Sequence, residues 1–277
     1  MKLIVPTIHE EQLVKSRDRL SAMIRRRFEQ QESSRLRQQA VQDLSLSALR
    51  RLVKSDKEVE KAVKQAKTAF GKEAKSGSGH TRQTHLRPRP LNEMATILAP
   101  PNLFPWQTSQ TTGSDAGVQI TIDPSSGQIS LVASAGGTTA YAAGALGGYF
   151  QPQAANDVAF ISSFPSVNYD LQTWTFLDWA YANGFVGLYV GEYTLDGQGI
   201  ATLVDQQISL STIGAYEGNS SGYPLNAQIF VDNDHFYEVW VWAGANAGGA
   251  GWSAFWGGAG LAQNYVTVPS IVIYSYG

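Results

Sequence analysis

Cysteine is absent from the 277 residues, which excludes disulfides, thiolate metal sites and cysteine nucleophiles. Nowhere do 18 apolar residues follow one another, so we predict no membrane-spanning helix. The first six residues run at once into the polar segment Thr7-Ile8-His9-Glu10-Glu11, which leaves no apolar core for a signal peptide. We therefore expect a protein that is cytoplasmic or is exported by a non-classical route.

Lysine and arginine are absent from Pro90 to Gly277. All 21 of them lie between Lys2 and Arg89, whereas the 23 acidic residues divide into 10 before position 90 and 13 after it. The two parts therefore carry formal charges of +11 and −13. We predict two modules of opposite charge, whose attraction is long-ranged and screened by salt.

Residues 1–70 are predicted to form a basic amphipathic helical module. A capping box at Thr7–Glu10 precedes Leu13, Leu20, Ile24 and Phe28, which recur at helical spacing. Further helices are predicted after Asp43 and from Ser55 to Phe70. Narrow apolar stripes suit a helical hairpin or a coiled coil. We expect this module to dock or to self-associate, so that the protein forms a homo-oligomer.

The positive charge of this module also raises the question of nucleic acid. Arg25-Arg26-Arg27 and the spaced lysines that follow could track a phosphate backbone. However, ten acidic residues are interleaved with them and no nucleic-acid motif is present. Interleaved charge is typical of a solvated helix surface, so we do not favour nucleic acid as a partner.

Residues 71–105 are predicted to be a linker. Ser76-Gly77-Ser78-Gly79 is flexible, while Arg87-Pro88-Arg89-Pro90 and Pro100-Pro101 favour extended backbone. The linker separates the helical module from the acidic third region, residues 106–277.

Residues 106–277 show the short alternating runs of an all-β domain. The runs 118–122 and 128–132 flank Asp123–Gly127, a five-residue hairpin connection. No helix is predicted in this region. The pattern predicts an antiparallel β-sandwich of jelly-roll type. Further strands are expected near residues 139–150, 157–164, 172–182, 185–194, 200–211, 225–231, 235–243 and 265–275.

One of these strands organises the domain. From His235 to Trp242, the residues His235, Tyr237, Val239 and Val241 alternate with Phe236, Glu238, Trp240 and Trp242. Both faces are largely apolar. A strand of this kind belongs in the middle of a sheet, with one face against a second sheet and the other under loops or a partner.

No catalytic residue is assigned. Gly218-Asn219-Ser220-Ser221-Gly222 fits Gly-x-Ser-x-Gly, but a nucleophile elbow needs a strand before it and a helix after it. Glu192 and Glu238 both lie in apolar strands, and glycoside hydrolysis uses a carboxyl pair, but the sequence does not give their separation. We expect a non-enzymatic protein without a cofactor.

A domain without cations suits neutral sugars, which bind Asp, Asn and backbone groups beside aromatic rings, better than it suits phosphate or sulfate. Asp232 and Asp234 could also supply oxygen ligands to calcium, although a plain turn before a strand explains them equally well. The candidate ligand-binding residues are Trp252, Trp256, Tyr223, Asp232, Asn233 and Asp234.

The sequence therefore predicts a two-module binding protein, in which a lectin-like β-sandwich recognises a glycan or a cell surface. The main alternative is a structural subunit of a self-assembling particle or filament, because a surface rich in small and aromatic residues lacks the charges that prevent association. A pore-forming toxin is the third hypothesis.

Overall fold

The computed structural model describes residues 14–15, 17–30, 33, 61, 65, 68, 95–152, 157–176, 178–210, 216–220, 223–252 and 257–276. Residues 17–30 form the one continuous helix in these ranges. The described residues therefore do not support the predicted helical hairpin or coiled coil. The helices predicted after Asp43 and from Ser55 to Phe70 lie outside the described residues, apart from Lys61, Gln65 and Thr68, which are helical.

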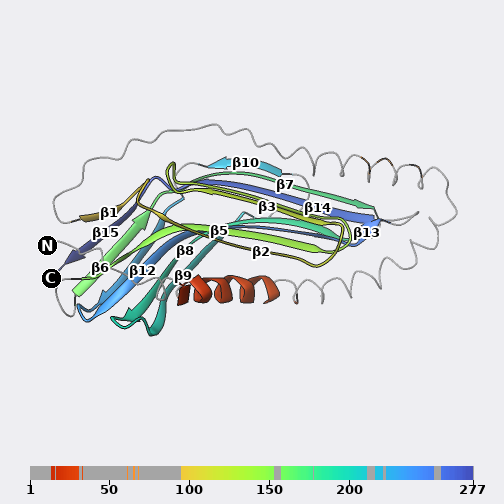
Figure 1. Ribbon diagram of the computed structural model, residues 1–277. Helices are drawn as coiled ribbons and strands as arrows, with labels where there is room; N and C mark the ends of the chain where they lie inside the picture. Colours follow the sequence, from red (N-terminus) through yellow and green to blue (C-terminus); the bar gives the residue numbers. More distant parts are fainter. Residues whose placement is uncertain are drawn as a thin grey trace.

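All strand pairs are antiparallel and form three sheets, which confirms an antiparallel β-sandwich (Figure 1). The five-stranded sheet runs in the order β2 (Phe104–Thr111), β5 (Thr139–Phe150), β12 (His235–Gly249), β8 (Ala180–Thr194) and β9 (Gly199–Ser209). The six-stranded sheet runs β10 (Tyr216–Ser220), β7 (Ser166–Phe176), β14 (Gly257–Thr267), β4 (Gln128–Ala135) and β3 (Ala116–Asp123), with β13 (Gly251–Trp252) added on β14. The four-stranded sheet runs β1 (Ala95–Leu98), β15 (Ile271–Tyr276), β6 (Asp157–Ser163) and β11 (Leu225–Val231).

Three prolines divide one layer of the sandwich into two sheets. Pro165 lies between β6 and β7, Pro224 between β10 and β11, and Pro269 between β14 and β15. Proline has no N–H for a strand ladder, so each strand is interrupted there. On one side of the breaks the order is β11-β6-β15, and on the other it is β10-β7-β14. The breaks are therefore aligned, and the four- and six-stranded sheets form one bent layer.

The predicted two-faced strand is confirmed at the centre of the five-stranded sheet. β12 pairs with β5 on one side and with β8 on the other. Val239 and Val241 belong to the core between the two layers, whereas Trp240 and Trp242 belong to a separate buried cluster on the other face. The helix, residues 17–30, covers that second face (Figure 1).

The helix packs its apolar stripe onto a wall of aromatic residues. Leu20 and Ile24 are fully buried there, and the ring of Phe28 stacks on Tyr141 with 4.3 Å between centroids. The predicted helical spacing of these three residues is therefore what allows the basic segment to dock on the acidic sandwich. The aromatic wall consists of Trp106, Tyr141, Tyr149, Phe185, Tyr189, Tyr193, Phe236, Trp240 and Trp242.

Strand boundaries differ from prediction where glycine is abundant. β14 begins at Gly257, within a Gly-rich stretch that no predicted strand covers. A Cβ at Gly258 would lie 2.0 Å from the carbonyl oxygen of Trp179, and one at Gly260 would lie 2.1 Å from that of Tyr181. Glycine is needed here because the two layers approach backbone to backbone.

Two predicted strands each span the end of one observed strand and the start of the next. The run 172–182 includes the end of β7 and the start of β8, and the run 265–275 crosses from β14 into β15. The first strands also begin earlier than expected, since β1 and the start of β2 lie within the range predicted as linker, 71–105. No helix among the described residues is long and apolar enough to cross a membrane.

Candidate functional site

The residues predicted to bind a ligand do not lie together. Tyr223 and the turn Asp232-Asn233-Asp234 lie at opposite ends of β11, a seven-residue strand about 23 Å long. Trp252 lies in β13, beyond the far end of the fifteen-residue β12, which places it about 50 Å from the acidic turn. Trp256 lies outside the described residues. The roles of Trp252 and Trp256 therefore stay predictions.

The acidic turn is organised by its own hydrogen bonds. The Asn233 N–H donates to the Asp232 carboxylate at 2.9 Å, and the Asp232 N–H donates to the Tyr237 hydroxyl at 2.8 Å. The Asp234 side chain is 71% exposed. Within the described ranges, no three His, Asp or Glu side chains are grouped so that they could hold a metal ion. Of the two interpretations of this sequence, a calcium site and a plain turn before a strand, the plain turn accounts for these contacts.

Glu192 and Glu238 lie on neighbouring strands but on opposite faces of the same sheet. Glu192 pairs with Tyr237, and Glu238, the next residue along β12, pairs with Gly191. Consecutive residues of a strand point to opposite faces. The Glu192 carboxylate accordingly contacts His235 Nδ1 at 3.0 Å, on the same face as Tyr237. These two carboxyls do not form the pair that glycoside hydrolysis uses.

Glu238 lies instead in a buried polar network beneath the helix. It is fully buried, and it accepts hydrogen bonds from the Tyr193 hydroxyl and from Trp240 Nε1 at 2.9 Å. Burial, followed by the nearby charge of Glu238, raises the pKa of Tyr189 to about 12 and also raises the pKa of Tyr193. Both tyrosines therefore stay protonated donors at neutral pH.

The Gly-x-Ser-x-Gly segment is not a nucleophile elbow. Gly218 and Ser220 lie in β10, and the next element after the segment is β11, which starts at Leu225. A strand rather than a helix follows, so the segment lacks the strand-to-helix turn that exposes a nucleophilic serine.

The outer face of the four-stranded sheet carries exposed aromatic and amide side chains, and we call it the aromatic–amide face. The alternate residues of these strands point into the core, as Ile161 and Ile273 do. On the outer face Phe230 is 81% exposed and Phe160 is 40% exposed. The described outer-facing residues are Ile97, Val158, Phe160, Ser162, Asn226, Gln228, Phe230, Val272 and Tyr274, and none of them is charged.

Strand register sets the spacing of the rings on this face. Phe160 on β6 pairs with Tyr274 on β15 and with Gln228 on β11. Directly paired residues have Cβ atoms about 5 Å apart, and diagonal neighbours such as Phe160 and Phe230 lie about 7–8 Å apart. The face therefore offers a row of three rings across three strands, with Asn226 and Gln228 beside it.

Sequence reasoning missed this face, although β11 contained the signal. Asn226, Gln228 and Phe230 alternate with the buried Leu225, Ile229 and Val231 along the strand. An aromatic residue on the same strand face as two amides is expected to face solvent, where it is available to a ligand.

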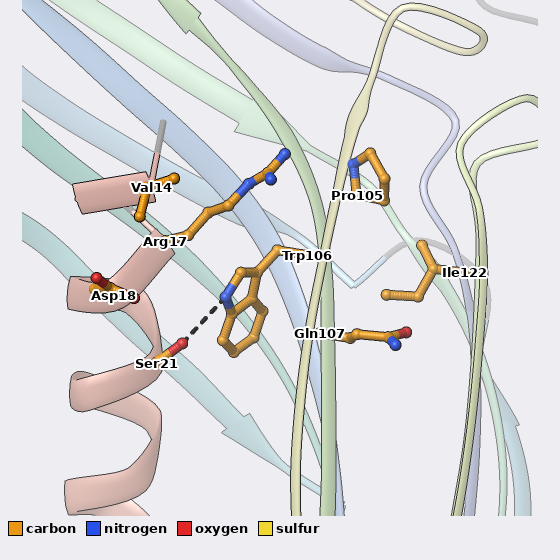
Figure 2. Close-up of a pocket in the computed structure, with 8 residues that line it drawn as sticks. All are labelled: Val14, Arg17, Asp18, Ser21, Pro105, Trp106, Gln107 and Ile122. Carbon is orange, nitrogen blue, oxygen red and sulfur yellow. Dashed lines mark hydrogen bonds between the residues drawn. The ribbon is translucent and has the colours of Figure 1, made fainter. Parts of the chain in front are cut away.

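A second candidate site is a groove between the helix and the edge of the five-stranded sheet (Figure 2). It has a volume of about 540 Å³. Trp106 forms part of its wall, and the indole Nε1 donates to the Ser21 hydroxyl at 3.2 Å. We call it the seam groove; its lining includes Val14, Arg17, Asp18, Ser21, Trp106, Gln107 and Ile122.

Comparison with known proteins gives no family. No family model matches the chain, and no curated protein does. Among solved structures, the enzymatically active domain of bacteriophage CBA120 tailspike protein 4 is 14% identical, with a TM-score of 0.20; the match covers 58% of this chain and 19% of that one. The carbohydrate-binding module TmCBM61, solved with β-1,4-galactotriose, is 12% identical with a TM-score of 0.18, over 61% of this chain and 87% of that one.

An infectious bursal disease virus (Gt strain) structure is 9% identical with a TM-score of 0.19, over 71% of this chain and 42% of that one. TM-scores this low do not indicate a shared fold. The function proposed below therefore depends on the residues of this chain alone.

Proposed function

We propose that this protein is a non-enzymatic binding protein whose β-sandwich recognises a neutral glycan through the aromatic–amide face. The observation that carries the proposal is the exposure of Phe230 and Phe160, at 81% and 40%, on a sheet face whose described residues carry no charge. Large exposed apolar patches on soluble proteins mark interaction sites.

The chemistry of the face suits a sugar. The apolar C–H face of a pyranose ring stacks on aromatic side chains, and its hydroxyls exchange hydrogen bonds with amides. Phe160, Phe230 and Tyr274 supply the rings, while Asn226 and Gln228 supply donors and acceptors. A charged ligand would find no counter-charge among the described residues of this face.

The helical module has a docking role in this proposal. Within the described ranges, its helix packs on the layer opposite to the aromatic–amide face and buries Leu20 and Ile24 there. The glycan face is therefore left open while the helix is docked.

The order of the strands supports the finer inference that the sandwich is a jelly roll. If each proline-interrupted strand is counted once, β5, β12, β8 and β9 are neighbours in one layer, and β4, β14/β15, β6/β7 and β10/β11 are neighbours in the other. Successive strands of this set alternate between the layers, except that β8 and β9 pair with each other in the same layer. An eight-stranded double sheet of this kind is the jelly-roll arrangement.

A structural subunit of an assembly is the second candidate, and the same face favours it. β1 and β11 are the edge strands of the four-stranded sheet, and neither contains a lysine or arginine. Uncharged edges and apolar faces promote association between copies. Homo-oligomerisation through this face would therefore bury Phe230.

A glycan array and a sizing measurement on full-length protein test the proposal. Wild type should bind neutral glycans, whereas Phe230→Ala should lose that binding with an unchanged melting temperature, because an exposed ring contributes little to folding. If Phe230→Ala instead converts an oligomer to a monomer and no neutral glycan binds wild type, the structural-subunit function replaces this proposal.

A further inference from the structure

The helix brings cations to a domain that has none of its own, since no lysine or arginine occurs from Pro90 onward. Two of these cations have partners on the sheet. Arg19 Nη2 donates to the Gly199 carbonyl oxygen at 3.0 Å, and its guanidinium lies over the Tyr193 ring. Arg27 donates to the Asp205 carbonyl oxygen at 3.0 Å. These two arginines hold the helix on the sheet.

Arg17 differs from both. Its side chain extends from the helix into the seam groove, beside Trp106 and toward Pro105 (Figure 2). Its Nε is buried and has no hydrogen-bond partner within the described part of the chain. A buried guanidinium donor without a partner costs free energy. It is therefore a group that a ligand could satisfy.

The other walls of the groove define what such a ligand would be. Trp106 and Ile122 supply apolar surface, and Gln107 supplies an exposed amide. The volume of about 540 Å³ falls in the range of about 300–1,000 Å³ that is typical of ligand sites. The groove therefore combines one cation, an amide and an apolar wall.

We propose that the seam groove binds a sugar that carries a carboxylate, namely a hexuronate residue. Arg17 pairs with the carboxylate, whose planar geometry matches the guanidinium fork. Gln107 takes hydroxyls of the ring, and the apolar face of the ring lies on Ile122 and the edge of Trp106. Asp18 also lines the groove, so a single negative charge fits better than a phosphate dianion.

This site is independent of the aromatic–amide face. It needs the docked helix, because Arg17 comes from the helix while Trp106 and Gln107 come from β2. The sandwich without the helix has no cation with which to bind a carboxylate. Loss of neutral-glycan binding in Phe230→Ala would leave hexuronate binding unaffected, so the two proposals fail separately.

The test is a titration of full-length protein with D-glucuronate and, separately, with D-glucose, in which binding is measured by NMR or calorimetry. Glucuronate should bind and glucose should bind more weakly. Arg17→Gln should weaken glucuronate binding roughly tenfold or more, because a charge-assisted bond is lost. Arg25→Gln is the matched control, since Arg25 is exposed on the same helix, and it should bind as wild type does.

Arg17→Gln could weaken binding by disturbing helix docking. Gln107→Ala separates this effect from the loss of a ligand contact, because Gln107 is exposed on β2 and does not belong to the helix. It should weaken the binding of glucuronate without changing the melting temperature. The proposal is overturned if glucuronate does not bind, if glucose binds equally well, or if Arg17→Gln and Arg25→Gln weaken binding to the same extent.

Discussion

Arg27 of the helix and Asp205 of β9 are 178 residues apart in the sequence and form an ion pair across the seam between helix and sheet. Arg27 also donates to the Gln207 side chain, and its guanidinium lies 5.8 Å from the centroid of the Trp242 ring. This is one place where the basic module meets the acidic one. The expected attraction between the modules therefore has a defined contact.

The first prediction concerns the energy of this pair. The two side chains are 25% and 34% exposed, so we expect a coupling energy of roughly 0.2–1 kcal/mol. A double-mutant cycle of Arg27→Gln and Asp205→Asn, measured by denaturant unfolding at low and moderate salt, should show this coupling and its decrease with salt. Arg26→Gln, at an exposed position on the same helix, should show none. A coupling that does not change with salt would contradict the electrostatic account.

The second prediction concerns the apolar part of helix docking. Ile24 is fully buried against the aromatic wall, so Ile24→Ala should cost about 2–5 kcal/mol in unfolding free energy or in helix docking. Exposure of the aromatic wall should appear as increased binding of a hydrophobic dye. Arg25→Ala, at an exposed position, should stay within about 0.5 kcal/mol of wild type. If Ile24→Ala changes neither stability nor dye binding, the helix is not docked in solution.

The third prediction concerns glycines that lie opposite tryptophans. Gly187 pairs with Trp242, and a Cβ there would lie 2.4 Å from Trp242 Nε1 and 2.3 Å from the Gln206 carbonyl oxygen. Gly187→Ala should destabilise the protein by roughly 1–3 kcal/mol through overpacking. Gly117→Ala is the matched control, because its Cβ would meet only the Ser134 hydroxyl, at 3.1 Å. Equal melting temperatures for the two variants would show that Trp242 does not pack against Gly187.

The fourth prediction concerns alkaline pH. Burial raises the pKa of Tyr189 from 10.0 to about 12, so the folded state keeps its proton where the unfolded state loses it. The stabilisation from protonated Tyr189 is complete below pH 10 and is lost as the pH rises from 10 toward 12. Unfolding midpoints measured from pH 8 to 11 should fall at the alkaline end, and less steeply in Tyr189→Phe. If the unfolding midpoint falls equally in both proteins at alkaline pH, the group that titrates is not Tyr189.

Much of the fold could be predicted because alternation is strong where side chains are large. Residues 139–150 and 225–231 are strands with the predicted bounds, and the two-faced strand at His235 lies at the sheet centre. The start of β14 could not be predicted, because Gly258 and Gly260 are required by the close approach of the backbone at Trp179 and Tyr181 in the other layer. Sequence periodicity does not record such tertiary contacts.

The position of the candidate site could not be predicted from the sequence. The absence of cations after Arg89 favours neutral ligands, which stays a prediction, and Tyr223, the Asp232 turn and Trp252 lie far apart. The register that separates Glu192 from Glu238 is a property of strand pairing, which a single sequence does not give. The exposure of Phe230 could have been predicted, because the sequence shows that Phe230 lies on the same face of its strand as Asn226 and Gln228.

Binding of a neutral glycan to the aromatic–amide face is the central claim, and one dissociation constant tests it most directly. The neutral glycan that binds wild type best on an array would be titrated into Phe230→Ala and into Ile200→Ala, whose side chain is 47% exposed on β9, away from this face. We predict affinity roughly tenfold or more weaker for Phe230→Ala, since apolar surface buried between sugar and ring contributes about 25 cal/mol per Å², and an unchanged value for Ile200→Ala. Equal affinities in the two variants would contradict the claim.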